Sequence, residues 1–583
     1  MGSAVATTPT PAEVASKKAL DEMFACIKAN QSFLLEAGAG AGKTYSLVKA
    51  LQFLIDQHQR DFARRGKQIA CITFTNVAKA QIEERIDKNP LVFCDTNHAF
   101  CWSLISNFQK QLRELLSTLP KWPERIVEAG GIGNRAISYK LGFRAIREKE
   151  VLLHHDDVLP LTIALMENEK FRRMIADRFP IILIDEYQDT DANWVEAIKK
   201  HFLGQPNSPL FGFFGDHWQK IYGDGCGKLE HPALKVIGKE ANFRSVQIVV
   251  NALNNMRPEL PQFVEDPQSP GVVRVFHTNS WKGARQSGSH WAGDLPTDAA
   301  HTALEQVKAA LESEGWDLSA GSTKILMLTH RLLANEQGYS SLVSVFRYAE
   351  AFSKKEHAYI AYFVDVIEPA CDAFADRKYG AMFHALGGDV PLLSTHADKQ
   401  RWNAAMTGLI AVRDKGTVGD VLDYLLKSKL PRLSDAVYSL ERDLQAYTPR
   451  EGEEMPPALR EVADLREVSY QEIKNLRQYL AGFSPFETKH GVKGDQFENV
   501  IVVIGRGWNH YNFGEMLEFA GDKSIPAKKA EAFERNLNLF YVACSRPQKR
   551  LALLFTQQLS ADAMNTLAKW FGADALVALD VVG

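Results

Sequence analysis

The sequence predicts an α/β protein made of two parallel-sheet units, each interrupted by a mainly helical insertion. Short apolar runs typical of buried strands alternate with helix-like patterns in two separate blocks. Polar residues follow most of these runs, at the strand ends where open parallel sheets bind ligands. The expected divisions are 1–101 with 151–241 for the first unit, 102–150 for its insertion, 242–335 with 481–583 for the second unit, and 336–480 for its insertion.

The first block contains the clearer alternation. Strands are expected where apolar runs are bounded by polar residues, at 33–35, 69–74, 91–94, 180–184 and 210–214. Helices are expected at 15–29, from 45 to about 57, at 77–86, 171–178 and 192–202. Residues 61–67 are interpreted as a basic connector, and 102–150 as helical and charge-mixed with a Gly-rich break at 130–133.

The second block begins after residue 245. Strands are expected at 272–276, 324–328, 499–504 and 551–555, with a Gly/Ser-rich loop at 280–298. Residues 336–480 are mostly helical in pattern, with breaks at 387–388 and 448–457. Two sheets of strands connected by helices follow from this order.

Composition is ordinary for a globular protein, with 45% hydrophobic and 24% charged residues among 583. No apolar run approaches the ~18 residues of a membrane helix, and residues 1–11 lack the features of a secretion signal, so no membrane partner is expected. The seven cysteines are scattered without a C-x-x-C pair, which favours the reducing cytoplasm and predicts no zinc site. A net charge of −3 means that any nucleic-acid binding depends on a local surface.

The segment from Ala37 to Thr44, AGAGAGKT, is typical of a phosphate-binding loop between a strand and a helix. Ala37 stands where the usual pattern has its first glycine, and Gly38, Gly40 and Gly42 allow backbone amides to converge on phosphate oxygens. Lys43 is expected to reach the β- and γ-phosphates of ATP. The Thr44 hydroxyl is expected to hold Mg²⁺.

Further candidates lie at later strand ends. Asp185 is expected in the Mg²⁺ shell, and Glu186 is expected to orient and deprotonate the attacking water. Gln219 follows another strand and is a candidate γ-phosphate contact. Arg244 and Arg546 lie in the second unit and are candidate arginine fingers.

Together these segments resemble the motif set of the superfamily 1 helicases of the UvrD/Rep/PcrA type. The similar segments, in chain order, are 37–44 (motif I), 73–80 (Ia), 96–98 (Ib), 185–190 with the letters DEYQDT (II), 215–222 (III), 242–245 with NFRS (IV), 488–497 (V) and 541–546 (VI). They cover both units, so the resemblance implies two RecA-like motor domains.

The resemblance also implies roles for single residues. Phe243 would stack on adenine, and Arg244 and Arg546 would contact the γ-phosphate. A single-stranded DNA channel would be lined by residues that match motifs Ia, Ib, III and V, namely Phe74, Asn76, His98, Tyr222, Thr488 and His490. Translocation in the 3′ to 5′ direction is implied by the resemblance alone.

The chain departs from the family pattern in four places. Residues 17–21 contain no adenine-reading glutamine, and no aromatic residue directly follows Tyr222 to stack on a base. Gln496 stands where a glutamate is usual, and the insertion at 102–150 is short for the family. Strong processive unwinding is therefore in question.

Two functions of different classes stay open. The first is an ATP-dependent translocase and helicase acting on single-stranded and tailed duplex DNA. The second is a nucleotide-gated subunit that controls a partner nuclease, as in antiviral defence of the Gabija kind, with weak or no unwinding alone. A small-molecule kinase is a poor third, because it leaves Arg244, Arg546 and the second sheet without a role.

Overall fold

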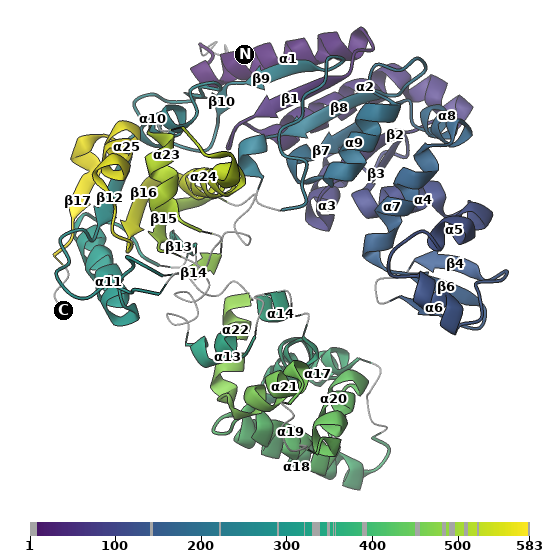
Figure 1. Cartoon of the computed structure of the whole chain (residues 1–583), viewed down its shortest axis with the longest axis vertical. Coiled ribbons are helices and arrows are strands. Elements are labelled where there is room, and N and C mark those ends of the chain that lie inside the picture. The colour runs from purple at the N-terminus through teal and green to yellow at the C-terminus, as the bar shows by residue number, and fades with distance from the viewer. Residues whose placement is uncertain are drawn as a thin grey trace, which may run out of the picture.

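In the residues that it describes, the computed structural model contains two six-stranded sheets with all strand pairs parallel, and a further helical region (Figure 1). The residues that the structure describes are 8–139, 144–220, 223–288, 291–319, 321–328, 338–346, 350–353, 355, 357–387, 393–448, 455–480, 486–488, 496–506, 511–521 and 524–580. The α/β class and the parallel sheets predicted from the sequence are confirmed.

The first sheet has the strand order β3-β2-β7-β8-β1-β9. Its strands are β1 (Phe33–Ala37), β2 (Ile69–Thr73), β3 (Val92–Thr96), β7 (Ile181–Asp185), β8 (Leu210–Gly215) and β9 (Lys235–Lys239). In β1, β2, β7 and β8 every residue is buried, because both faces of the sheet are covered.

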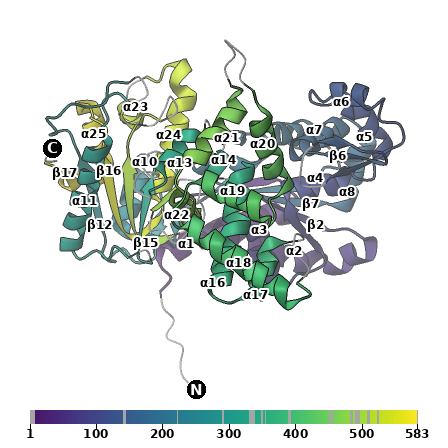
Figure 2. The same cartoon turned by 90° about the horizontal axis from the view of Figure 1, so that it is seen from below.

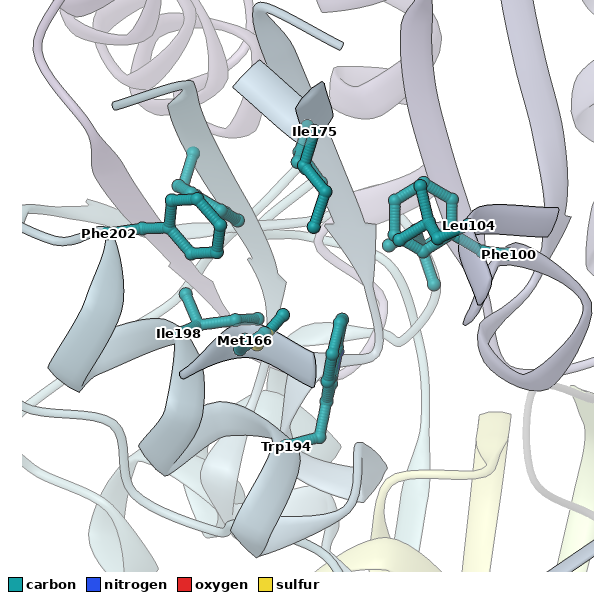
Figure 3. A pocket seen from close by; sticks show the side chains of 10 residues that line it. Phe100, Leu104, Met166, Ile175, Trp194, Ile198 and Phe202 are labelled. Atoms are coloured by element: carbon teal, nitrogen blue, oxygen red, sulfur yellow. The ribbon is translucent and has the colours of Figure 1, made fainter. Parts of the chain in front are cut away.

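Successive residues of these strands belong to different cores. Phe33 and Leu35 pack with α1 (Pro11–Lys28), α2 (Lys43–Arg65) and α3 (Asn76–Arg85). Leu34 points to the opposite face, which is covered by α4 (Asn97–Ile105), α7 (His155–Met166), α8 (Glu169–Arg178) and α9 (Ala192–His201). A small apolar cavity remains within this second layer (Figure 3), lined by Ile72, Phe100, Leu104, Met166, Ile175, Ile182, Trp194, Ile198, Phe202 and Phe211.

The predicted basic connector at 61–67 is wrong for most of its length, because α2 continues to Arg65. Phe62 is buried and extends the apolar face of the helix. Gly66 then ends α2 in the left-handed conformation, with φ 65°, as is common at helix C-termini.

The first insertion is only partly helical, which corrects the sequence prediction for 102–150. After α5 (Gln109–Leu116) and α6 (Pro123–Glu128), the chain forms a three-stranded sheet of β4 (Ala136–Tyr139), β5 (Ala145–Ile146) and β6 (Glu150–Leu153), in the order β4-β6-β5. Strands of two to four residues are too short to show a period of two. Packing of Ile137, Val151 and Leu153 into the adjacent core stabilises them instead.

The second sheet has the order β14-β13-β15-β16-β12-β17. Its strands are β12 (Val272–His277), β13 (Thr323–Met327), β14 (Phe486–Thr488), β15 (Phe497–Ile504), β16 (Pro547–Phe555) and β17 (Leu576–Ala578). One face packs on α11 (Thr297–Ser313), and the other on α10 (Gln247–Met256), α23 (Phe513–Ala520), α24 (Ala530–Cys544) and α25 (Ala561–Phe571). The short strands β10 (Ala241–Asn242) and β11 (Phe263–Val264) pair with each other; in the sequence they follow the last strand of the first sheet and precede the first strand of the second.

The second insertion is mostly helical in its described ranges, as predicted, with one isolated antiparallel bridge between Thr417 and Ser469. It consists of α13 (Ser340–Val345), α14 (Glu350–Ser353), α15 (Ala358–Tyr362), the π-helical segment Phe363–Ile367, α16 (Glu368–Ala375), α17 (Tyr379–Leu386), α18 (His396–Arg413), α19 (Val418–Ser428), α20 (Asp435–Ala446), α21 (Pro457–Glu467) and α22 (Tyr470–Leu480). Figure 1 shows this region below the two α/β units, and Figure 2, seen from below, shows it in the centre between them. None of the helices in the described ranges is both long enough and apolar enough to cross a membrane.

Candidate active site at the ends of the two sheets

The phosphate-binding loop connects β1 to α2, as the sequence predicts. Gly40 and Gly42 have φ of 75° and 74°, a region that residues with a Cβ atom rarely adopt. Space is also limited, since a Cβ atom on Gly40 would lie 2.7 Å from Cβ of Arg244. The first backbone amides of α2 and its dipole make the end of this loop suitable for an anion such as a phosphate.

A carboxylate pair follows β7. Asp185 is buried at the strand end, and Glu186 has left-handed backbone angles with φ and ψ both 48°. Oε2 of Glu186 accepts a hydrogen bond of 2.6 Å from Nε2 of Gln188 and lies 3.7 Å from Nζ of Lys43. A strained backbone at a strand end is typical of a side chain held in position for function.

The end of β8 is connected to the same carboxylates. Nε2 of Gln219 donates to Oδ2 of Asp216 over 2.7 Å, and the Asp216 amide donates to Oε1 of Gln188 over 3.0 Å. Gln188 therefore bridges Asp216 and Glu186, with Gln219 on the far side of Asp216. All three of Gln188, Asp216 and Gln219 are buried.

The segment after β9 contacts the phosphate-binding loop directly. The side-chain amides of Asn242 and Gln262 both donate to the carbonyl oxygen of Ala39, over 3.0 and 3.1 Å. The Phe243 amide donates to the carbonyl oxygen of Gly40 over 2.9 Å. The Phe243 ring is 38% exposed beside the loop, so it is available for stacking on a base.

Arg244 and Arg546 meet at one residue. Nη1 of Arg244 donates to the carbonyl oxygen of Ser545 over 3.0 Å, and Nη2 of Arg546 donates to the Ser545 hydroxyl over 3.1 Å. Arg546 is almost fully buried, and its Nε donates to the carbonyl oxygen of Val542 over 2.9 Å. The structure thus brings together two arginines 302 positions apart and places the Cβ of Arg244 against Gly40.

Three expected DNA contacts lie at the ends of neighbouring strands. Phe74 follows β2 and is 38% exposed, and Asn76 is the exposed first residue of α3. His98 follows β3 and stacks on His155, with ring centroids 3.4 Å apart. Burial, together with the nearby His155, lowers the pKa of His98 to about 4, so the ring is neutral at physiological pH.

The remaining expected contacts cannot be placed. Thr488 is the last residue of β14, where only the backbone is described. Tyr222 and His490 lie outside the described residues.

Comparison with known proteins finds similarity to an ATPase-type domain and to DNA helicases. Residues 22–224 match the family model of an AAA domain. The Gabija protein GajB of Bacillus cereus is 21% identical, with 95% of this chain and 97% of the relative aligned. The ATP-dependent DNA helicase Rep of Escherichia coli is 27% identical over 40% of this chain and 42% of Rep. The ATP-dependent DNA helicase PcrA of Staphylococcus aureus is 23% identical over 38% of this chain and 37% of PcrA.

These similarities support a helicase of the UvrD/Rep/PcrA type. The sequence did not predict one further polar group of this site, a buried lysine beside the phosphate-binding loop. Nζ of Lys239, at the end of β9, donates to the Ser46 hydroxyl over 2.7 Å and to the carbonyl oxygen of Gly42 over 3.2 Å. It also lies 5.7 and 6.0 Å from the ring centroids of Tyr45 and Phe243.

Burial lowers the pKa of Lys239 to about 8. The ammonium group of Lys239 lies next to two exposed aromatic rings, on the side of the loop where Phe243 lies. The only sequence signal for it was a lysine between a five-residue strand and the NFRS segment, which is too weak to identify a site. Its position is relevant because residues 17–21 of this helicase lack the expected glutamine.

Proposed function

We propose that this protein is an ATP-driven motor that translocates along single-stranded DNA and unwinds tailed duplexes. The observation that carries the proposal is the meeting of Arg244 and Arg546 at Ser545, next to Gly40 of the phosphate-binding loop. Because the second unit supplies these arginines, the rate of ATP hydrolysis would depend on the position of the second unit relative to the first. In the proposed motor, residues 1–101 with 151–241 and 242–335 with 481–583 form the two RecA-like domains.

The proposed chemistry is phosphoryl transfer from ATP to water. The amides of the loop from Ala37 through Gly42 would bind the phosphates, with Gly38, Gly40 and Gly42 providing space and Lys43 providing charge. Glu186 would take the proton of the attacking water. Gln219 would contact the γ-phosphate.

The oxygen donors of Thr44 and Asp185 match the hard ligands that Mg²⁺ prefers; Thr44 lies in the first turn of α2 and Asp185 is the last residue of β7. Bound Mg²⁺ would neutralise phosphate charge. Arg244 and Arg546 would stabilise the charge that develops in the transition state, while Phe243 would stack on the base of the nucleotide.

The proposed movement follows from changes in the distance between the two units. ATP would draw them together, because groups from both bind it, and hydrolysis would release them. Phe74, Asn76 and His98 would hold DNA on the first unit, and Tyr222, Thr488 and His490 complete the proposed channel. The 3′ to 5′ direction is proposed by analogy with the family.

The test measures ATP hydrolysis with and without single-stranded DNA, together with unwinding of duplexes that carry a 3′ or a 5′ tail. The expected result is DNA-stimulated hydrolysis and unwinding of the 3′-tailed duplex. Hydrolysis that DNA does not stimulate would overturn the motor, and unwinding of only the 5′-tailed duplex would reverse the polarity.

A second function is favoured by the extent of one alignment. The Gabija protein aligns with 95% of this chain, whereas Rep and PcrA align with 40% and 38%. In this alternative, the ATP state of the chain controls a partner nuclease in antiviral defence, in the cytoplasm. ATPase activity without unwinding, and with unwinding or DNA cleavage gained only when a nuclease is added, would favour it over the autonomous helicase.

A further inference from the structure

A buried arginine that the proposed chemistry does not use joins the second unit to the first. Arg257 directly follows α10, and its side chain is only 2% exposed. Nη1 donates to Oδ1 of Asp216 over 2.5 Å, and Nη2 donates to Oε1 of Glu36 over 3.0 Å. Both carboxylates belong to the first unit, at the ends of β8 and β1.

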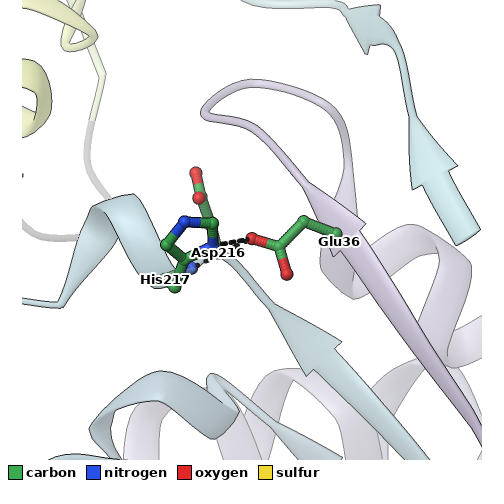
Figure 4. A group of neighbouring side chains, drawn as sticks. All are labelled: Glu36, Asp216 and His217. Atoms are coloured by element: carbon green, nitrogen blue, oxygen red, sulfur yellow. Dashed lines mark hydrogen bonds and ion pairs between the residues drawn. The ribbon is translucent and has the colours of Figure 1, made fainter. Parts of the chain in front are cut away.

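The carboxylates around Arg257 are closely grouped. Glu36, Asp216 and His217 each offer a ligand atom within 4.8 Å of the others (Figure 4). Such a group could hold a metal ion, but here the guanidinium of Arg257 already supplies the positive charge to two of its members. We therefore interpret the group as an ion-pair network.

Glu36 is held as a charged group. Its Oε1 is 2.5 Å from Nδ1 of His217, and its Oε2 accepts a hydrogen bond of 2.7 Å from the Tyr187 hydroxyl. Burial alone would raise the pKa of Glu36, but the contacts with His217, Tyr187 and Arg257 lower it to about 2. Arg257 thus lies between two carboxylates, at least one of which stays ionised over the physiological range.

Aromatic residues from both units border the network. The Trp218 ring lies 5.5 Å from Cζ of Arg257 and packs edge-on against Tyr541, with centroids 5.3 Å apart. Tyr541 is buried in α24, and the positive charge of Arg257 beside it offsets part of the rise in its pKa that burial causes. Arg257 therefore contacts the helix that ends just before Arg546.

Asp216 connects Arg257 to the residues proposed to act in hydrolysis. Its Oδ1 binds Arg257, its Oδ2 binds Gln219, and its amide binds Gln188. Gln188 in turn donates to Oε2 of Glu186 over 2.6 Å. A continuous series of hydrogen bonds therefore runs from Arg257 through Asp216 and Gln188 to Glu186.

We propose that Arg257 is a positioning residue that holds Asp216 in place. Asp216 in turn fixes Gln188, which orients Glu186, and Gln219, the proposed contact of the γ-phosphate. The proposal rests on the proposed function, in which Glu186 activates water. It adds that the second unit acts on catalysis through Arg257 as well as through its arginine fingers. Displacement of a catalytic group by about 1 Å can slow a reaction about 100-fold. Loss of the two-pronged contact of Arg257 with Asp216 and Glu36 should therefore lower kcat measurably.

The first test uses Arg257→Lys in the full chain, which keeps the charge but cannot bind both carboxylates as a fork. The expected result is a kcat for DNA-stimulated ATP hydrolysis lowered by about 10- to 100-fold, with KM for ATP within about twofold of wild type. The matched control is Arg413→Lys in the helical insertion, where Arg413 pairs with the buried Glu368. The control should have similar loss of thermal stability and unchanged kcat.

The second test separates positioning from general stability by a double-mutant cycle. Gln188→Met removes the middle of the series, and it is combined with Arg257→Lys. If the two residues act through one another, the double variant has a kcat close to that of the slower single variant. Multiplied effects on kcat, or an unchanged kcat in Arg257→Lys, would overturn the proposal.

If Arg257→Lys does not fold, Asp216→Asn takes its place in the cycle, because it keeps the side-chain shape and weakens the same ion pair. Wild-type hydrolysis that Lys43→Ala abolishes supports the proposed function independently. With that result in hand, a fast Arg257→Lys enzyme refutes only the positioning role. A wild-type chain that does not hydrolyse ATP refutes both.

Discussion

The ammonium group of Lys43 lies 3.7 Å from the carboxylate of Glu186. Their side chains are 11% and 26% exposed, so water screens the pair only partly. Lys43 begins α2 and Glu186 follows β7, which means that the two halves of the expected nucleotide site are already in contact. Phosphates arriving at the loop would compete for Lys43 and leave Glu186 facing the attacking water.

Replacement of Lys43 by alanine should abolish ATP hydrolysis, because the ammonium group neutralises phosphate charge. The fold should stay intact, because the Lys43 side chain is not part of a hydrophobic core. Phosphate release at saturating DNA measures the loss, and a thermal unfolding curve checks the fold. Lys474→Ala, which removes a lysine paired with Asp414 in the helical insertion, serves as the control. Near-wild-type turnover of Lys43→Ala would remove the basis of the site assignment.

Replacement of Glu186 by glutamine should lower kcat by about 10²- to 10⁴-fold, the usual contribution of a general base. Nucleotide binding should persist, since the amide keeps the hydrogen-bonding shape of the carboxylate. The variant should therefore hold ATP without turning it over, as a fluorescent nucleotide and a phosphate assay would detect together. A kcat within about twofold of wild type would assign the base elsewhere.

Replacement of Arg244 or Arg546 by lysine should lower kcat by about 10³-fold or more, because lysine keeps the charge but loses the planar fork. KM for ATP should change less, since the arginines act mainly on the transition state. Arg550→Lys is a suitable control, because Arg550 lies on β16 near Arg546 and donates to the carbonyl oxygen of Gly315. Equal effects of all three substitutions would point to a structural role.

The sequence was informative where a buried strand ends in polar residues. Asp185 and Asp216 could each be assigned to a sheet edge, because an apolar run of about five residues precedes each of them. Parallel pairing then brings these ends together in the structure. The meeting of Arg244 and Arg546 could be inferred only from the motif resemblance, since no local pattern connects positions so far apart.

Other features depend on contacts that leave no periodic signal. Arg257 contacts Glu36 across 221 positions, and neither residue stands in a patterned segment that predicts a partner. The strands β4 to β6 are stabilised by packing against the adjacent core, and their two to four residues are too few to show the alternation of a strand. Lys239 was missed because the five-residue strand β9 alternates too briefly to be distinguished from a loop.

The logarithm of the binding constant for single-stranded DNA should fall linearly with the logarithm of the salt concentration. The slope should be about −0.7 for each phosphate contacted. Phe74→Ala should weaken binding at every salt concentration and leave the slope unchanged, because a stacking ring binds a base and not a phosphate. Base stacking is worth about 1–3 kcal/mol per base. Fluorescence anisotropy with an unstructured oligonucleotide measures both quantities, and a flat salt profile would mean that the channel is misassigned.

The pKa of Lys239, lowered by burial from 10.5 to about 8, predicts a pH dependence of nucleotide binding. Below about 8 the ammonium group is charged and attracts an anionic ligand at the loop, so KM for ATP should rise as the pH increases through about 8. Lys239→Met should have a high KM with no such rise. The exposed Lys235, at the other end of β9, provides the control as Lys235→Met.

The same shift has the opposite effect on folding, which makes the assignment of Lys239 testable. Because the pKa is lower in the folded chain than in the unfolded one, the unfolded chain binds the proton more tightly between about 8 and 10.5. The contribution of Lys239 to the free energy of unfolding should therefore increase with pH over this window, while ATP affinity decreases. A rise in KM that persists in Lys239→Met would assign the titrating group to another residue.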